Sequence, residues 1–171
     1  MLKTKRLLLV PLDLKYSDEI YNNIWSCKDV LKYTYADVIT SKFECNERIK
    51  VWINEYTDKK NNNNFVVLKD NKVIGLAGYP ILDKSKKEFG LYYQLTKELW
   101  GNGYGSEIVE TLLDEIKRVY VNAIINVDVV SINYSSIRIL KKLGFTITER
   151  IANGFVKNDN VYDLLKLNKK L

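Results

Sequence analysis

Residues 99–108 read LWGNGYGSEI, and this stretch constrains the fold because it places three of the chain's eight glycines just before a helical pattern. The aromatic run Phe89–Leu95 before it is typical of a strand. Apolar residues from Ile108 to Tyr120 recur at three- and four-residue intervals, which predicts an amphipathic helix. A strand, glycines and a helix N-terminus in this order direct backbone N–H groups at an anion. The stretch therefore predicts an anion-binding loop, and the alternative is a tight turn without a ligand.

Two common nucleotide-binding loops fit this stretch poorly. A Walker loop needs Gly-Lys-Ser/Thr after its glycines, and no such residues follow here. A Rossmann fingerprint has the spacing G-x-G-x-x-G within a doubly wound sheet, whereas the spacing here is G-x-G-x-G after what reads as an antiparallel meander. The glycines alone therefore do not identify the ligand.

The order of elements predicts an α+β fold. Its mostly antiparallel sheet is flanked by helices, with a parallel strand pair only where the long helix crosses over. The expected strands are Arg6–Leu12, a hairpin over 65–82 with its turn at Lys69–Lys72, Phe89–Leu95, Ala123–Val130, Phe145–Ile151 and Val161–Leu167. Two helical pieces are expected before residue 57, the second over Phe43–Tyr56 with Ser41 and Glu44 as its capping box, and another over Ser135–Leu143. A length of 171 residues predicts one domain, residues 1–171.

Composition excludes several kinds of site. The chain has no histidine, which removes Ser-His-Asp and Cys-His catalytic sets. Cys27 and Cys45 lie outside any C-x-x-C spacing, so we expect no metal site and reduced thiols in a cytoplasmic protein. No run approaches the roughly 20 apolar residues of a membrane span, and Pro11 cuts the N-terminal apolar run too early for a signal peptide.

The net charge of +6 favours an anionic partner, but the basic residues are scattered. The dense lysine runs, at 59–60 and 84–87, have turn-like composition and no interleaved aromatic residues. We therefore expect neither nucleic acid nor a membrane as a partner.

Two motifs carry a resemblance to a known family. Residues 88–107, EFGLYYQLTKELWGNGYGSE, follow a pattern close to E-I-G-Y-x-L-x-x-x-x-W-G-x-G-Y-x-x-E, with Glu88 as its first acidic residue. Residues 133–145, NYSSIRILKKLGF, follow N-x-x-S-x-x-x-L-E-K-x-G-F, with Lys141 in place of the usual Glu. Together they resemble the Gcn5-related N-acetyltransferase (GNAT) superfamily, in its branch similar to the ribosomal-protein N-terminal acetyltransferases. The resemblance covers nearly the whole chain.

The resemblance implies a binding site for acetyl-CoA between two splayed parallel strands. Backbone amides from Asn102 to Ser106 would hold the diphosphate, with Gly103 and Gly105 at the family's glycine positions and Tyr104 between them. The backbone N–H of Leu95 would polarise the acetyl carbonyl. Asn133 and Ser136 would approach the pantetheine arm and the sulfur. Trp100 would pack under the loop.

The same resemblance implies catalytic roles for two residues. Many members use a tyrosine where this chain has Leu140, so Ser136 is the nearest hydroxyl for the departing thiolate; its alternative role is to cap the helix. Glu88 is the first candidate for general base, and Asp128 and Glu44 are the other two, although each could be a structural or surface charge. For Glu107, in the first turn of the helix, a structural role is favoured over a catalytic one.

The function implied is direct transfer of an acetyl group from acetyl-CoA to a primary amine, either a protein N-terminus or a small molecule. Because Leu140 replaces the family's tyrosine, a non-catalytic acyl-CoA-binding or sensing module is the alternative. The resemblance does not distinguish a monomer from a homodimer.

Overall fold

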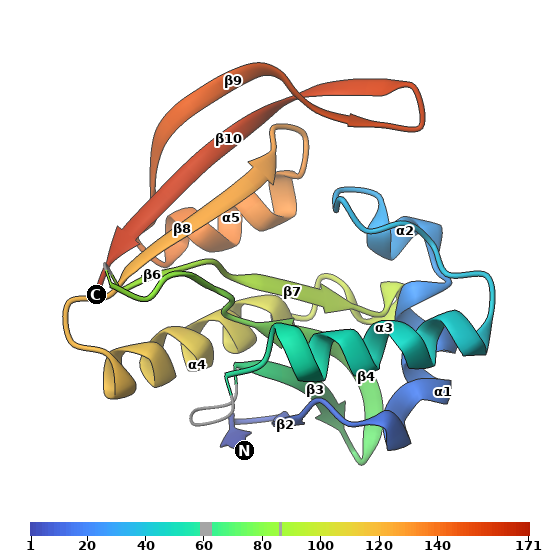
Figure 1. The fold of residues 1–171 in the computed structure, drawn as a ribbon. Coiled ribbons are helices and arrows are strands. Elements are labelled where there is room, and N and C mark those ends of the chain that lie inside the picture. The colour runs from blue at the N-terminus through green and yellow to red at the C-terminus, as the bar shows by residue number, and fades with distance from the viewer. Residues whose placement is uncertain (59–62, 86) are drawn as a thin grey trace.

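The computed structural model describes residues 1–58, 63–85 and 87–171 and contains two five-stranded sheets (Figure 1). The first sheet has the antiparallel order β1 (Leu2–Lys3), β2 (Leu8–Pro11), β3 (Asn64–Lys69), β4 (Lys72–Gly78) and β7 (Tyr92–Leu95). The second has the order β5 (Ile81–Asp83), β6 (Glu88–Phe89), β8 (Ile124–Val130), β10 (Asn160–Lys170) and β9 (Thr146–Lys157). Its β6 and β8 form a parallel pair, with Glu88 opposite Ile124. The predicted α+β class, with one parallel pair at the crossover, is confirmed.

Helices cover both faces of the first sheet. The helical elements are η1 (Leu14–Tyr16), α1 (Ser17–Ile20), the π-helical turn η2 (Tyr21–Trp25), α2 (Lys28–Leu31), α3 (Lys42–Glu55), η3 (Lys97–Leu99), α4 (Tyr104–Val119) and α5 (Tyr134–Lys142). In β3, Phe65 and Val67 belong to the core with α4, whereas Val66 and Leu68 belong to the core with α3. This strand is an unbroken apolar run because both of its faces are buried.

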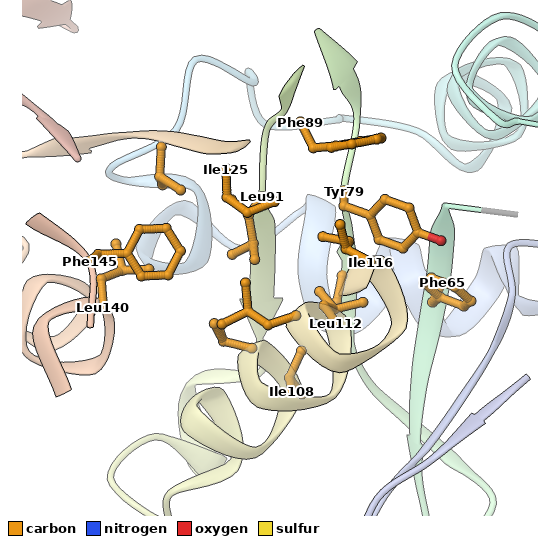
Figure 2. Packing of buried hydrophobic residues seen from close by; sticks show 14 of the residues in the cluster. Phe65, Tyr79, Phe89, Leu91, Ile108, Leu112, Ile116, Ile125, Leu140 and Phe145 are labelled. Carbon is orange, nitrogen blue, oxygen red and sulfur yellow. The ribbon is translucent and has the colours of Figure 1, made fainter. Parts of the chain in front are cut away.

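The long helix α4 forms the centre of the larger core. Ile108, Leu112 and Ile116 are fully buried and point between the two sheets, toward residues such as Phe89 and Ile125 (Figure 2). Their spacing is the one that predicted this helix, which is confirmed. α4 therefore fixes the position of the glycine loop relative to both sheets.

The predicted strand Phe89–Leu95 is wrong in one respect: it is two strands in different sheets. β6 ends at Phe89 and β7 begins at Tyr92, and the Gly90 amide between them donates to the Pro80 carbonyl at 2.8 Å. Phe89, Gly90 and Leu91 are buried in succession, which a strand of alternating exposure does not allow. The chain thus leaves one sheet for the other at this point, and β7 and β8 diverge beyond it (Figure 1).

Other elements follow the predictions with shifted bounds. α3 begins at the predicted capping box, in which Ser41 Oγ accepts from the Glu44 amide at 3.2 Å. The predicted 65–82 hairpin turns at Asp70 and Asn71, both with positive φ, as a type I′ turn requires, but it ends at Gly78. Residues 81–82, predicted to belong to it, lie in β5 of the second sheet. The C-terminal strands β9 and β10 are longer than predicted and form a hairpin that curves over β8 toward α2 (Figure 1). Among the helices of the described segments, none is long and apolar enough to cross a membrane.

Candidate active site

The outer edge of β7 carries backbone groups that face the divergence between β7 and β8. The Thr96 amide donates to the Ile74 carbonyl of β4 at 2.8 Å, and Leu95 lies opposite Gly75. Because backbone groups along an antiparallel strand point alternately to its two sides, Gln94 faces β4 as Thr96 does, whereas Tyr93 and Leu95 face outward. The Leu95 N–H is therefore not an ordinary ladder amide but is directed at the diverging edge.

The facing edge of β8 is arranged in the same way. The Ile124 amide donates to the Lys87 carbonyl at 3.0 Å, on the β6 side, and the Ser131 amide donates to Asp163 on the β10 side. The carbonyl of Asn126 and the backbone groups of Asp128 therefore continue along the β6 side after β6 has ended at Phe89. A ligand with amide groups along its length can pair with both edges.

The glycine loop ends where the amides of α4 begin. Gly101 and Gly103 both have φ of 79°, a conformation that glycine adopts without strain, and Gly103 is the N-cap of α4. The first hydrogen bond of the helix runs from the Glu107 amide to the Gly103 carbonyl. The amides of Tyr104, Gly105 and Ser106 precede that bond, and at a helix N-terminus such amides are available to an anion.

Thr4 and Arg6 of the N-terminal segment form hydrogen bonds with the glycine loop and with the start of α4. The Glu107 carboxylate accepts from Thr4 Oγ1, from the Arg6 amide at 2.7 Å and from Arg6 Nε at 2.7 Å. The Arg6 guanidinium also donates to the Asn102 carbonyl at 3.0 Å and lies 4.3 Å from the centroid of the Tyr104 ring. Burial raises the pKa of Glu107, but the hydrogen bonds from Thr4 and Arg6 together outweigh it and hold that pKa below its usual value. These contacts show the structural role that was favoured for Glu107.

Side chains of the loop residues make internal contacts, which leaves backbone groups for a ligand. Asn102 Nδ2 donates to the carbonyls of Leu99 and Trp100, and the Tyr104 ring is buried. Gly105 packs closely, since an added Cβ would lie 3.0 Å from Ile139 Cδ1 and 3.2 Å from Tyr93 Cε2, and these side chains would have to shift to admit it. Trp100, predicted to pack under the loop, is 47% exposed and donates from Nε1 to the Leu95 carbonyl at 2.9 Å.

Ser136 and Asn133 lie at the start of α5, directly after β8. Asn133 is the N-cap, and its Oδ1 accepts from the Ser136 amide at 3.3 Å. The Ser136 hydroxyl lies 2.9 Å from the Tyr93 hydroxyl of β7. Leu140, at the position of the family's tyrosine, is fully buried in the core that contains Phe145.

The first motif also contains a signal for Tyr93, which is not among the residues predicted above. Counted back from Trp100 without a gap, the pattern E-I-G-Y-x-L places its Glu at Gly90 and its Tyr at Tyr93. Glu88 lies two positions before that point, and the structure places it in β6 opposite Ile124. Ser136 follows the other end of β8, about 20 Å along the strand at 3.3 Å per residue. The structure thus does not bring Glu88 and Ser136 together.

The two other candidates for the base differ in their surroundings. Asp128 is exposed. It lies on the opposite face of β8 from Val127 and Val129, which pack in the core with α4. Glu44 Oε2 accepts from the Thr40 amide and hydroxyl, and the amide hydrogen bond is the main reason that its pKa is lowered. Glu44 therefore stabilises the start of α3. In the part of the chain that the structure describes, no cluster of His, Cys, Asp or Glu could hold a metal ion.

The sequence and the fold both have matches among known proteins. Residues 6–146 match the family model described as an acetyltransferase (GNAT) domain. A curated relative, the uncharacterised N-acetyltransferase p20 of Bacillus licheniformis, is 30% identical over 115 residues, which span 66% of this chain and 64% of that relative.

Solved structures show the same fold at lower identity. The ribosomal L7/L12 α-N-protein acetyltransferase RimL, in complex with coenzyme A, has a TM-score of 0.85 and 14% identity, and covers 98% of this chain and 96% of its own. Spermidine N-acetyltransferase from Vibrio cholerae, in complex with CoA and spermine, has a TM-score of 0.83 and 18% identity, covering 96% and 95%. With the family model spanning most of its length, the chain belongs to the GNAT acetyltransferase family.

Proposed function

We propose that this protein transfers an acetyl group from acetyl-CoA to a primary amine by direct attack within a ternary complex. The observation that carries the proposal is the outward-facing Leu95 amide, on an open strand edge beside the glycine loop and the start of α4. This arrangement supplies a hydrogen-bond donor for an acetyl carbonyl and a set of amides for a diphosphate, as the chemistry of acetyl-CoA requires.

Each group in the proposed site has one task. The amides of residues 102–106 bind the diphosphate, and the edges of β7 and β8 pair with the amides of the pantetheine arm. The Leu95 N–H stabilises negative charge on the acetyl oxygen as the amine attacks. Ser136 donates a hydrogen bond to the sulfur, and the Asn133 side chain holds the first turn of α5 in place.

We place the entry of the amine on the face of β8 opposite α4 and α5, because those helices pack against the other face. Asp128 lies on that face of β8, whereas Glu88 pairs at the far end of the strand. We therefore favour Asp128 over Glu88 as the carboxylate that accepts this proton, directly or through water.

The acceptor class is proposed as a primary amine, either a protein N-terminus or a small molecule. RimL is named for its action on a ribosomal protein, and the Vibrio cholerae enzyme was solved with spermine. The net charge of +6 favours a less cationic acceptor than spermine. We further propose that residues 1–171 act as one domain in the cytoplasm, in keeping with two free cysteines, Cys27 and Cys45.

The test has two parts. Calorimetry with CoA and acetyl-CoA measures binding, and a thiol-release assay measures transfer to a panel that contains N-terminal peptides, amino acids and polyamines. Binding followed by thiol release with at least one amine is the expected result. No heat with either cofactor would overturn the proposal, and tight binding without release on any amine would favour the acyl-CoA-sensing alternative.

A further inference from the structure

The contact between Tyr93 and Ser136 joins the two sheets on the α4–α5 side of the diverging strands. Tyr93 belongs to β7 of the first sheet, Ser136 follows β8 of the second, and their hydroxyl oxygens lie 2.9 Å apart. The Tyr93 ring also lies against Gly105 of α4. Three elements thus fix the position of this hydroxyl pair.

The direction of the hydrogen bond determines where the serine proton points. Either hydroxyl could donate. Burial raises the pKa of Tyr93, so the phenol keeps its proton at neutral pH and remains a donor. A serine hydroxyl that accepts from the phenol retains one proton of its own to donate elsewhere.

We infer that Tyr93 is a positioning residue for acetyl transfer, whose hydroxyl donates to Ser136 Oγ and turns the serine proton toward the thioester sulfur. The inference rests on the proposed function. When the amine nitrogen bonds to the acetyl carbon, the carbon–sulfur bond breaks and its electron pair goes to sulfur. The Ser136 hydrogen bond stabilises this thiolate, and a polarised chain of two hydroxyls does so more strongly than one. Ser136 keeps its proton. The amine proton passes to Asp128, directly or through water, and the released thiolate takes a proton from water.

The burial of Leu140 is consistent with this assignment. In this chain the position of the family's tyrosine holds an apolar side chain with 0% exposure, packed with the core around Phe145. The phenol near the start of α5 comes instead from β7. The chain thus retains a tyrosine hydroxyl at the site, delivered by a different element.

The experiment measures the pKa of the CoA thiol bound to the protein, followed by the ultraviolet absorbance of the thiolate as the pH is raised. A hydrogen-bond donor beside sulfur favours the thiolate and lowers that pKa. Tyr93→Phe removes only the hydroxyl, and we expect it to raise the bound-thiol pKa by about one unit and to lower kcat about tenfold, with little change in CoA affinity. Ser136→Ala should do the same, and the double variant should add little to either, because the two groups act as one chain.

The matched control is Tyr92→Phe. This neighbouring hydroxyl donates to Asn64 Oδ1 on the other face of the sheet, so its loss should leave the bound-thiol pKa unchanged. An unaltered thiol pKa in a folded, CoA-binding Tyr93→Phe protein would overturn the inference. Failure of the wild-type protein to bind CoA at all would overturn the proposed function instead, so calorimetry with CoA separates the two failures.

Discussion

Glu107 shows how one side chain can hold the cofactor loop to the rest of the protein. Its carboxylate accepts from Thr4 and twice from Arg6, and Arg6 in turn donates to the carbonyl of Asn102. The Arg6 side chain is 41% exposed, so solvent screens the ion pair, and the hydrogen bonds to the mostly buried Glu107 carboxylate contribute most. The loop geometry therefore depends on the N-terminal segment as well as on its own glycines.

Glu107→Gln is predicted to lower the free energy of unfolding by about 1–2 kcal/mol at neutral pH, because the amide cannot accept all three hydrogen bonds. The pKa of Glu107 is lowered in the folded protein, so its contribution is present in full above the ordinary value of 4.5 and is lost as the pH falls through the lowered value. Urea unfolding at a series of pH values checks this. The two proteins should converge at acidic pH, and a constant difference at every pH would contradict the prediction.

Gly105→Ala is predicted to impair catalysis more than stability. The added methyl group favours the helix by up to about 1 kcal/mol, which offsets part of the crowding against Ile139 and Tyr93. Displacement of the Tyr93 ring lengthens its contact with Ser136, so kcat should fall about tenfold while Tm changes by only a few degrees. Kinetics and thermal denaturation on the same sample test this, and an unchanged kcat would show that the ring can adjust.

At this scale the sequence predicted local geometry, whereas the roles of the cofactor-binding and catalytic residues stay predictions. Gly103 precedes α4 and Ser136 lies in the first turn of α5, since glycine loops and helix caps are local structures. The motif match that includes Glu88 is two positions out of step with the ungapped pattern, and the break between β6 and β7 at Gly90 and Leu91 accounts for the difference. The partnership of Tyr93 with Ser136, 43 residues apart, depends on tertiary packing that neither residue's neighbours encode.

At the scale of helices and strands, the spacing of apolar residues and the capping residues predicted the elements that depend mainly on local sequence. The apolar stripe of α4 and the capping box of Ser41 and Glu44 gave helices with nearly the predicted bounds. The length of the β9–β10 hairpin was underestimated because most of β9 is exposed, so it lacks the alternation that marks a strand. Its turn at Asn158 and Asp159, both with positive φ, is the local signal that could have extended it.

Lys157 connects the β9–β10 hairpin to the end of α2 and the segment that follows it. Its Nζ donates to the carbonyls of Leu31, Thr34 and Ala36 at 3.0, 2.8 and 2.5 Å. Burial lowers the pKa of this lysine, but the charged amine is the donor for all three carbonyls. One side chain thus links two elements on the side of β8 where the proposed acceptor enters.

Lys157→Met is predicted to lower stability by about 1–3 kcal/mol, since it retains the stem but leaves three carbonyls without their donor. It should also raise the KM for the amine several-fold, with unchanged affinity for CoA. Lys169→Met is the control, because Lys169 donates to the carbonyl of Leu143 near the other end of the hairpin. If the two variants have equal effects on the amine KM, the Lys157 contact does not shape the acceptor site.

At the scale of the whole molecule, both sheets pack against α4 and separate at Gly90. The divergence of β7 and β8 therefore depends on how the two sheets are joined and not on the structure of either sheet alone. Within the described residues, no strand pairs with the outer edge of β7. A bound pantetheine arm would supply the missing partner and connect the sheets. Ligand binding should therefore stabilise the protein as a whole, by mass action on the folded state.

Amide hydrogen exchange tests this connection residue by residue. The amides of Gln94 and Thr96 face β4 and should exchange slowly with or without ligand, whereas those of Tyr93 and Leu95 face the open edge and should exchange faster in the free protein. Saturating acetyl-CoA is predicted to slow exchange of the Leu95 amide at least tenfold and to leave that of Thr96 almost unchanged, because only the outer edge gains an acceptor, the acetyl oxygen. NMR-detected exchange resolves these neighbours. Equal protection of Leu95 in the free and acetyl-CoA-bound protein would contradict the prediction, because it would mean that the acetyl carbonyl does not accept a hydrogen bond from the outer edge of β7.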